Sequence, residues 1–253
     1  MARSTSPIGK TLRLKGQKIR IHEVGATIEW ECGVPIFTEQ AERLIGGKTV
    51  IRGGMELMFP FLGQQPHDVP GVSLGQHGFL RDLPVTAFTQ AANYIVAHLE
   101  RPADDSFDWP TKFLIKVEGT GERSFRLLAA VTNEGTSPMP AGFGLHPYFD
   151  TGLGKPFSVH ADGIRLLDQD DVLANNAFAV PADGLVIRTC HGDIHVTSGL
   201  RSFDEVVLWT DQIQTYICAE PRTSPAKFAQ PDGIWVDPGQ VHSFEYYFEF
   251  QST

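Results

Sequence analysis

Hydrophobic and polar residues alternate along much of the chain with a period of two, the pattern of a β-strand with one buried face. The clearest case lies at residues 243–250, where Phe244, Tyr246, Phe248 and Phe250 fall on one side and serine, glutamate and tyrosine fall on the other. This segment predicts a half-buried strand near the C-terminal end of the chain.

Other segments also favour strands. Phe113, Ile115 and Val117 repeat the alternation, whereas residues 206–209 and 216–218 are apolar throughout, as in strands buried on both faces.

Helical periodicity is scarce in this sequence. Residues 86–97 are the one stretch that fits an amphipathic helix, and their threonine, aromatic and β-branched residues suit a strand equally well. The 25 glycines and 17 prolines separate the strand-like segments, and no stretch has the composition of an interdomain linker. We therefore expect an all-β fold, a large antiparallel β-sandwich in which residues 1–253 form a single domain.

Composition limits the classes of partner. With 42% hydrophobic and 20% charged residues, the chain has enough apolar material for a sizeable core. Its net charge of −9 argues against nucleic acid or an acidic membrane surface as a partner. We expect a neutral or modestly charged small molecule instead. The sequence shows no obvious subunit interface, so a monomer is the expected state, with a homodimer as the alternative.

Cysteine usage and the N-terminal segment bear on the compartment. Cys32, Cys190 and Cys218 are odd in number, widely spaced and without a CxxC pair, so we expect reduced, structural cysteines. The basic N-terminal residues lack the apolar segment of a signal peptide, and no apolar run approaches the roughly 18 residues of a membrane span. A cytoplasmic protein is expected.

Three short segments, residues 76–81, 144–149 and 217–221, place an ionisable side chain beside glycine, proline or aromatic residues. Proline restricts the preceding residue to extended geometry. His146 and Glu220 each precede a proline, so we expect both at strand ends, from which their side chains can converge on one concave face.

In their order along the chain, these segments resemble the aldose 1-epimerases (galactose mutarotases) and the related hexose-6-phosphate mutarotases. The resemblance begins at about Arg52, followed by Gly-Gly and then Phe-Pro, and continues through His-Gly-Phe at residues 77–79 with Arg81. Its most specific part is Gly-Leu-His-Pro-Tyr-Phe at residues 144–149. Phe-Asp at 203–204 is similar to the family's substrate-binding aspartate segment, and Cys-Ala-Glu-Pro at 218–221 to the segment with its catalytic glutamate.

The resemblance implies a galactose mutarotase-like supersandwich with a sugar site on a concave sheet, and acid–base catalysis without a metal or an organic cofactor. Glu220 would act as the base at the anomeric hydroxyl and His146 as the acid at the ring oxygen, while His77 would polarise or hold that oxygen. Four side chains are expected to contact sugar hydroxyls, because arginine forks, amides and carboxylates grip such groups: Arg52, Gln64, Arg81 and Asp204. An apolar platform under the sugar is expected from Phe79, Tyr148 and Trp209.

Several alternatives remain open from the sequence. His77, His146 and a carboxylate can bind zinc, but no HxH or HExxH spacing is present. Asp204 and Glu220 can act as the carboxylate pair of a glycoside hydrolase, which leaves both histidines without a role. A noncatalytic sugar-binding module would not require an acid and a base.

The sequence is mixed on whether the sugar is phosphorylated. A phosphate ester would require positive charge near the site, for which Arg52, Arg81 and Arg222 are the candidates. Pro-Tyr-Phe after His146 resembles the free-aldose branch, whereas His-Gly-Phe with Arg81 resembles the phosphate branch. We expect a free aldose, with glucose-6-phosphate 1-epimerase activity as the alternative.

Overall fold

The computed structural model describes residues 9–45, 47–168, 184–199 and 203–252. In this part of the chain the regular structure is extended, apart from the short 3₁₀ turns η1 (Leu80–Asp82) and η2 (Pro225–Lys227). The strands are β1 (Gly9–Leu14), β2 (Gln17–His22), β3 (Ile28–Glu31), β4 (Ala41–Ile45), β5 (Lys48–Arg52), β6 (Met55–Met58), β7 (Val85–Gln90), β8 (Tyr94–Arg101), β9 (Thr111–Gly121), β10 (Ser124–Asn133), β11 (Met139–Ala141), β12 (Gly144–Asp150), β13 (Ser158–Ala161), β14 (Ile164–Asp168), β15 (Gly184–Thr189), β16 (Gly192–Gly199), β17 (Glu205–Trp209), β18 (Tyr216–Arg222), β19 (Ile234–Val236) and β20 (Val241–Ser252).

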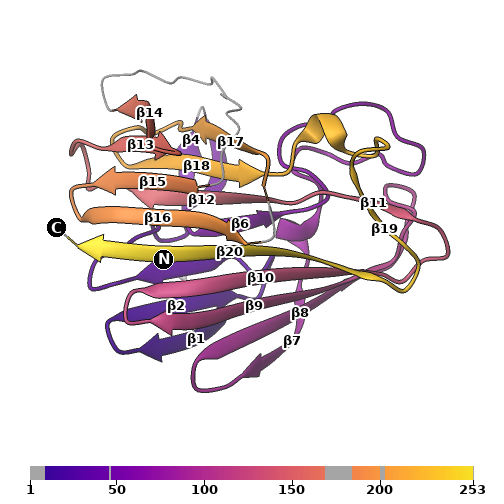
Figure 1. Ribbon diagram of the computed structural model, residues 1–253, viewed down its shortest axis with the longest axis horizontal. Helices are drawn as coiled ribbons and strands as arrows, with labels where there is room; N and C mark the ends of the chain where they lie inside the picture. Colours follow the sequence, from indigo (N-terminus) through magenta and orange to yellow (C-terminus); the bar gives the residue numbers. More distant parts are fainter. Residues whose placement is uncertain (1–8, 46, 169–183, 200–202, 253) are drawn as a thin grey trace.

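Two large antiparallel sheets form the body of the molecule (Figure 1). One has seven strands in the order β1-β2-β3-β6-β12-β18-β17, and the other has nine in the order β14-β13-β15-β16-β20-β10-β9-β8-β7. Aromatic side chains join the two layers: the Trp30 ring of β3 lies 5.0 Å from Phe125 of β10 and 6.4 Å from Phe248 of β20. The expected all-β sandwich is confirmed.

The alternation read from the sequence corresponds to one buried face per strand. In β20, Phe244, Tyr246, Phe248 and Phe250 are all buried, whereas Tyr247 between them is exposed. Residues 86–97 are not helical, since they belong to β7, a short turn and β8. Tertiary pairing decided that ambiguous segment, because both strands find partners at the edge of the nine-stranded sheet.

Because of the same alternation, the outer face of the seven-stranded sheet carries ionisable side chains. Leu145 of β12 and Ala219 of β18 point into the core between the sheets. Successive side chains of a strand point to opposite faces, so the neighbouring His146 and Glu220 lie on the outer face of this sheet.

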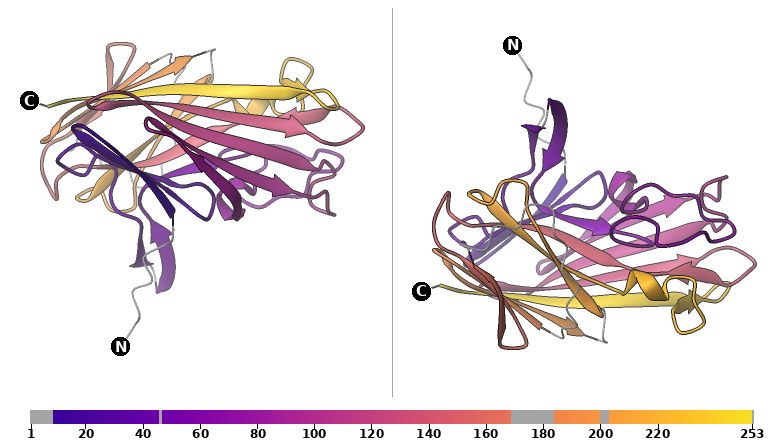
Figure 2. Two further views of the ribbon diagram at one scale, coloured as in Figure 1. Left: turned by 90° about the horizontal axis from the view of Figure 1, so that it is seen from below. Right: turned by 90° about the horizontal axis from the view of Figure 1, so that it is seen from above.

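A hairpin of β4 and β5 projects from the body of the sandwich (Figure 2). Its strands pair with each other, and its side chains Leu44 and Ile51 are exposed. Arg52, its last residue, returns the chain to β6 and to the outer face of the seven-stranded sheet.

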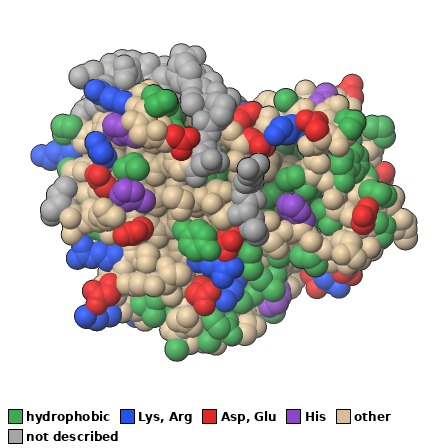
Figure 3. All heavy atoms as spheres, in the orientation of Figure 1, with side chains coloured by type: hydrophobic (Ala, Val, Ile, Leu, Met, Phe, Trp, Pro, Cys, Tyr) green, Lys and Arg blue, Asp and Glu red, His purple; other side chains and the backbone are tan. Residues whose placement is uncertain are grey.

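Acidic and basic side chains are intermixed on the face shown in Figure 3. No helix in the described ranges has the length and hydropathy of a membrane-spanning segment. All three cysteines are free, and Cys32 and Cys218 are buried. Cys190 is exposed in the turn after β15, and its thiol lies 3.9 Å from the Thr151 carbonyl oxygen.

Candidate active site

His146 and Glu220 face each other across neighbouring strands of the seven-stranded sheet. His146 Nε2 lies 3.1 Å from Glu220 Oε1, and the two residues are only 5% and 2% exposed. Both lie within β12 and β18 rather than at the expected strand ends. Their prolines instead mark an interruption: the β12–β18 register breaks off after Gly144 and resumes at Tyr148, because proline offers no N–H for a ladder hydrogen bond.

Burial governs the protonation of this pair. It raises the pKa of Glu220 to about 8, against the opposing pull of the Arg222 charge. It also lowers the pKa of His146 well below its usual range, with Arg81 and Arg52 among the charges that add to the effect. Near neutral pH Glu220 is therefore protonated and His146 is a neutral imidazole, because this arrangement leaves both buried groups uncharged. The two groups then share one titratable proton, which lies on the Glu220 carboxyl group.

His77 completes the expected trio from a loop. Its ring centroid lies 5.5 Å from that of His146. The backbone N–H of Gly63 donates a 3.0 Å hydrogen bond to His77 Nδ1. The backbone N–H of His77 in turn donates to the Gly63 carbonyl at 2.7 Å. Burial and the nearby arginines lower the His77 pKa to about 4. The neutral ring must then carry its proton on Nε2, which is left as a hydrogen-bond donor.

The loop geometry at His77 depends on a glycine. His77 and Gly78 both have positive φ angles, 70° and 67°. A Cβ on Gly78 would collide with the backbone carbonyl of Phe59, to which Phe79 N–H donates a 2.9 Å hydrogen bond. This contact ties the histidine loop to the end of β6.

Two of the three expected platform residues lie at the site. The Tyr148 ring stacks on His146 at 4.8 Å between centroids, and the half-buried Trp209 presents its edge at 5.6 Å. Phe79 does not join them. It packs in the core against Phe59 and Phe107, so the expectation for Phe79 was wrong. Phe79, the last residue of the His-Gly-Phe motif, follows two residues with positive φ and points into the core.

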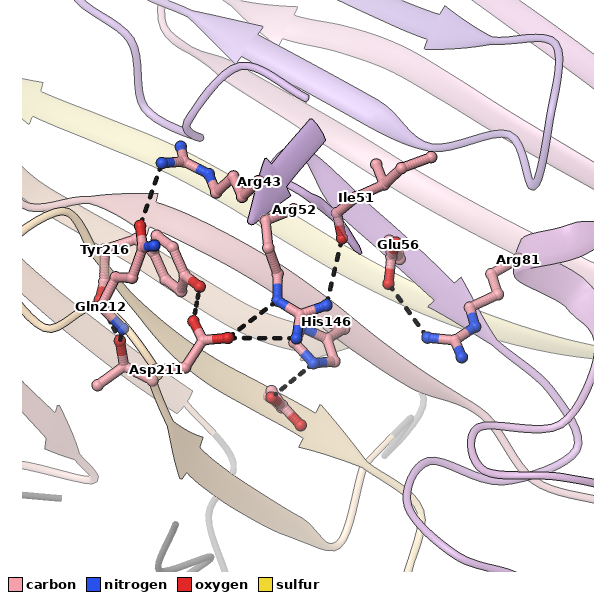
Figure 4. Close-up of polar contacts among 11 residues, drawn as sticks. Arg43, Ile51, Arg52, Glu56, Arg81, His146, Asp211, Gln212 and Tyr216 are labelled. Atoms are coloured by element: carbon pink, nitrogen blue, oxygen red, sulfur yellow. Dashed lines mark hydrogen bonds and ion pairs between the residues drawn. The ribbon is translucent and has the colours of Figure 1, made fainter. Parts of the chain in front are cut away.

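Arg52 reaches the site from the base of the hairpin (Figure 4). Its Nε and Nη2 donate to Asp211 Oδ2 at 3.3 and 3.2 Å, and its guanidinium lies 5.3 Å from the Trp209 ring centroid. Asp211 also accepts a hydrogen bond from the hydroxyl of Tyr216. Sequence reasoning missed Asp211, although an aspartate two positions after the apolar β17 run was a visible signal.

Arg81 also reaches the site, and it faces a carboxylate that the sequence analysis missed. Arg81 Nη1 lies 3.6 Å from Glu56 Oε2 (Figure 4), and Glu56, directly opposite His146 in the β6–β12 register, is 9% exposed. Burial raises the Glu56 pKa, while the Arg81 charge opposes this shift. The available signal was a single charged residue inside the apolar run of residues 55–59.

The remaining two expected sugar contacts lie in different surroundings. Gln64 is exposed in the loop after β6. The Asp204 carboxylate accepts hydrogen bonds from the Lys227 ammonium and the Ser224 N–H, both at 2.9 Å, and lines a hollow of about 180 Å³ with Phe61. Substrate contact by either residue stays a prediction.

The structure brings together a set of possible metal ligands that differs from the set of His77, His146 and a carboxylate considered from the sequence. Ligand atoms of His146, Cys218 and Glu220 lie within 4.8 Å of one another, and all three residues are buried. His77 is not a member of this set. These donors suit zinc, yet two of them are His146 and Glu220, which contact each other directly.

Residues 45–180, more than half of the chain, match the family model named Aldose 1-epimerase. The chain belongs to the aldose 1-epimerase family. A search of curated protein sequences finds no match.

Solved structures share the fold of this family member. A protein from Synechocystis sp. matches with a TM-score of 0.79 and 22% identity over 100% of this chain and 99% of that one. A galactose mutarotase related enzyme from Lactobacillus acidophilus matches with a TM-score of 0.73 and 19% identity, over 97% and 98% of the two chains. For a galactose mutarotase-like protein from Lactobacillus casei the values are 0.78 and 15%, over 96% and 100%.

Proposed function

We propose that this protein is a mutarotase that interconverts the α and β anomers of a hexose by acid–base opening and closure of the sugar ring. The observation that carries the proposal is the buried His146–Glu220 contact of 3.1 Å with the neutral His77 ring beside it. The anomeric hydroxyl and the ring oxygen are attached to the same carbon, so an acid and a base that serve both must be close neighbours.

In the proposed reaction one proton leaves the anomeric hydroxyl and another is added to the ring oxygen. Glu220 as carboxylate takes the proton of the anomeric hydroxyl, the carbonyl forms, the bond to the ring oxygen breaks, and imidazolium His146 protonates that oxygen. Rotation about the bond between C1 and C2 presents the other face of the aldehyde. Closure then returns the ring proton to His146, while Glu220 protonates the carbonyl oxygen.

The resting protonation of the pair corresponds to the middle of this cycle. Protonated Glu220 and neutral His146 are the state that closes an open-chain sugar, and transfer of one proton across their contact produces the state that opens a ring. His77, with its proton on Nε2, donates a hydrogen bond to the ring oxygen in this scheme. The pair thus keeps one proton throughout, and neither partner needs an external proton source.

The test is polarimetry or exchange NMR of freshly dissolved α-glucose and α-galactose, with wild type beside Glu220→Gln and His146→Asn. Wild type should accelerate mutarotation of at least one sugar, and each variant should lose about 10²–10⁴-fold of that rate. A wild type that leaves every rate unchanged contradicts the proposal, and sugar binding without turnover would then favour a noncatalytic module.

The chain contains a matched control for these variants. His22 Nε2 and Glu29 Oε1 also lie 3.1 Å apart, buried on the same sheet in β2 and β3. His22→Asn and Glu29→Gln remove the same chemical groups and should leave mutarotation within a few-fold of wild type. Equal losses in both pairs would mean that the effect is structural.

A further inference from the structure

The three arginines whose charges act on the proposed catalytic residues each face a carboxylate. Arg52 and Arg81 act on both histidines, and Arg222 acts on His77 and Glu220. Their carboxylate partners are Asp211 for Arg52, Glu56 for Arg81 and Glu205 for Arg222. The positive charge beside the catalytic pair is therefore balanced within the protein.

Two of these guanidinium groups have their nitrogen atoms committed. Arg52 uses Nε and Nη2 on Asp211 and Nη1 on the backbone carbonyl of Ile51. Arg222 uses Nε and Nη2 on Glu205, at 3.1 and 2.9 Å, and Nη1 on the carbonyl of Leu62. Each of these arginines therefore spends three of its five N–H donors on the protein, and a phosphate group could engage only the second N–H of Nη1 and of Nη2 without breaking a formed hydrogen bond.

Arg81 differs, because its contacts are looser. Its Nη1 is 3.6 Å from Glu56 and its Nε is 3.9 Å from Asp82, both beyond hydrogen-bond length. Its donors are therefore the easiest to redirect toward a ligand. Whether Arg81 serves as a receptor for an anion depends on the carboxylate that neutralises it inside the site.

Glu56 is that carboxylate. Its backbone is opposite His146, and its charge contributes to the raised pKa of Glu220, so it acts inside the site. The Asp82 side chain is 77% exposed, and solvent screens its charge. Glu56 and Asp82 are two carboxylates on one arginine, one buried beside the catalytic pair and one in water.

We propose that Glu56 determines substrate specificity by excluding phosphorylated sugars, so that the site takes an uncharged aldose. This inference rests on the proposed mutarotase function. A phosphate bound to Arg81 would displace Glu56 and leave a buried carboxylate uncompensated beside a second anion. A sugar hydroxyl donates to Glu56 and accepts from Arg81 at the same time, and so keeps the pair intact.

The experiment measures affinities for glucose and glucose 6-phosphate by calorimetric titration, in wild type, Glu56→Gln and Asp82→Asn. Wild type should prefer glucose. Glu56→Gln should shift the preference toward the phosphate by about tenfold or more, the scale of one close charge interaction in a partly buried site. Asp82→Asn removes the same charge from the same arginine on the solvent side and should shift it less than about twofold.

The outcomes separate this inference from the mutarotase proposal. An unchanged ratio in Glu56→Gln, or equal shifts in both variants, would overturn the role of Glu56 even if wild type accelerates mutarotation. A wild type without mutarotation would defeat the proposed function, while the binding ratio would still decide the role of Glu56.

A second measurement applies if Glu56→Gln does not fold. Raising the ionic strength from about 0.02 M to about 0.5 M screens repulsion, so glucose 6-phosphate should bind wild type better relative to glucose. Weaker phosphate binding at high salt would identify an attractive anion site and overturn the inference.

Discussion

Removal of the Glu220 carboxyl group should change how stability depends on pH. The Glu220 pKa is about 8 in the folded protein against an ordinary 4.5. A carboxyl group with a raised folded pKa contributes stability that is fully present below about pH 4.5 and is lost as the pH rises through about 8. At roughly 1.4 kcal/mol per pKa unit, the loss amounts to about 5 kcal/mol.

Glu220→Gln keeps the shape of the side chain and cannot ionise. The free energy of unfolding of wild type should therefore fall relative to this variant by about 3–4 kcal/mol between about pH 5 and about pH 8, the rest of the loss lying outside this range. Equilibrium urea unfolding of both proteins across this range measures the difference. A constant offset from the lost His146 contact does not affect the slope, which is the tested quantity.

Glu29→Gln is the control with the opposite sign. Burial pushes the Glu29 pKa upward, but contacts with His22, the Gln40 N–H and Arg20 bring it below its ordinary value. The stability from Glu29 is therefore present above about pH 4.5 and lost only at lower pH. Between about pH 5 and about pH 8 its difference from wild type should be flat. Parallel curves for wild type and Glu220→Gln would refute the assigned burial of the Glu220 charge.

Three further predictions concern the His77 loop, the turn after β10 and the cysteine thiols. Gly78→Ala should destabilise the protein by more than about 1 kcal/mol and slow mutarotation, because the new Cβ collides with the Phe59 carbonyl; an unchanged melting temperature and rate would contradict this. Asn133→Ala should cost about 3 kcal/mol in urea unfolding, since its buried amide donates to two carbonyls and accepts from the Gly135 N–H; a loss below about 1 kcal/mol would show that water replaces these bonds. Iodoacetamide should label Cys190 in the folded protein and spare both buried cysteines, as peptide mass spectrometry would show; early labelling of Cys218 would mean that the site opens.

Much of the fold and the central part of the site could be predicted from local sequence. Period-two alternation predicted β20 and β9 because a strand buries every second side chain regardless of its partners. His77, His146 and Glu220 could be selected because each lies in a short, chemically distinctive segment, and the structure brings them together. Their roles in the reaction remain predictions.

The tertiary structure alone decided how the charges are paired. Glu56 and Arg81 are 25 positions apart, and Arg52 and Asp211 are 159 apart, so no local pattern indicates that they meet. Strand register decides which side chain is opposite which, and burial then decides their pKa values, because desolvation depends on everything packed around a group. The sequence by itself determined which residues can exchange protons; the packing of the seven-stranded sheet and its loops determined which charges surround them.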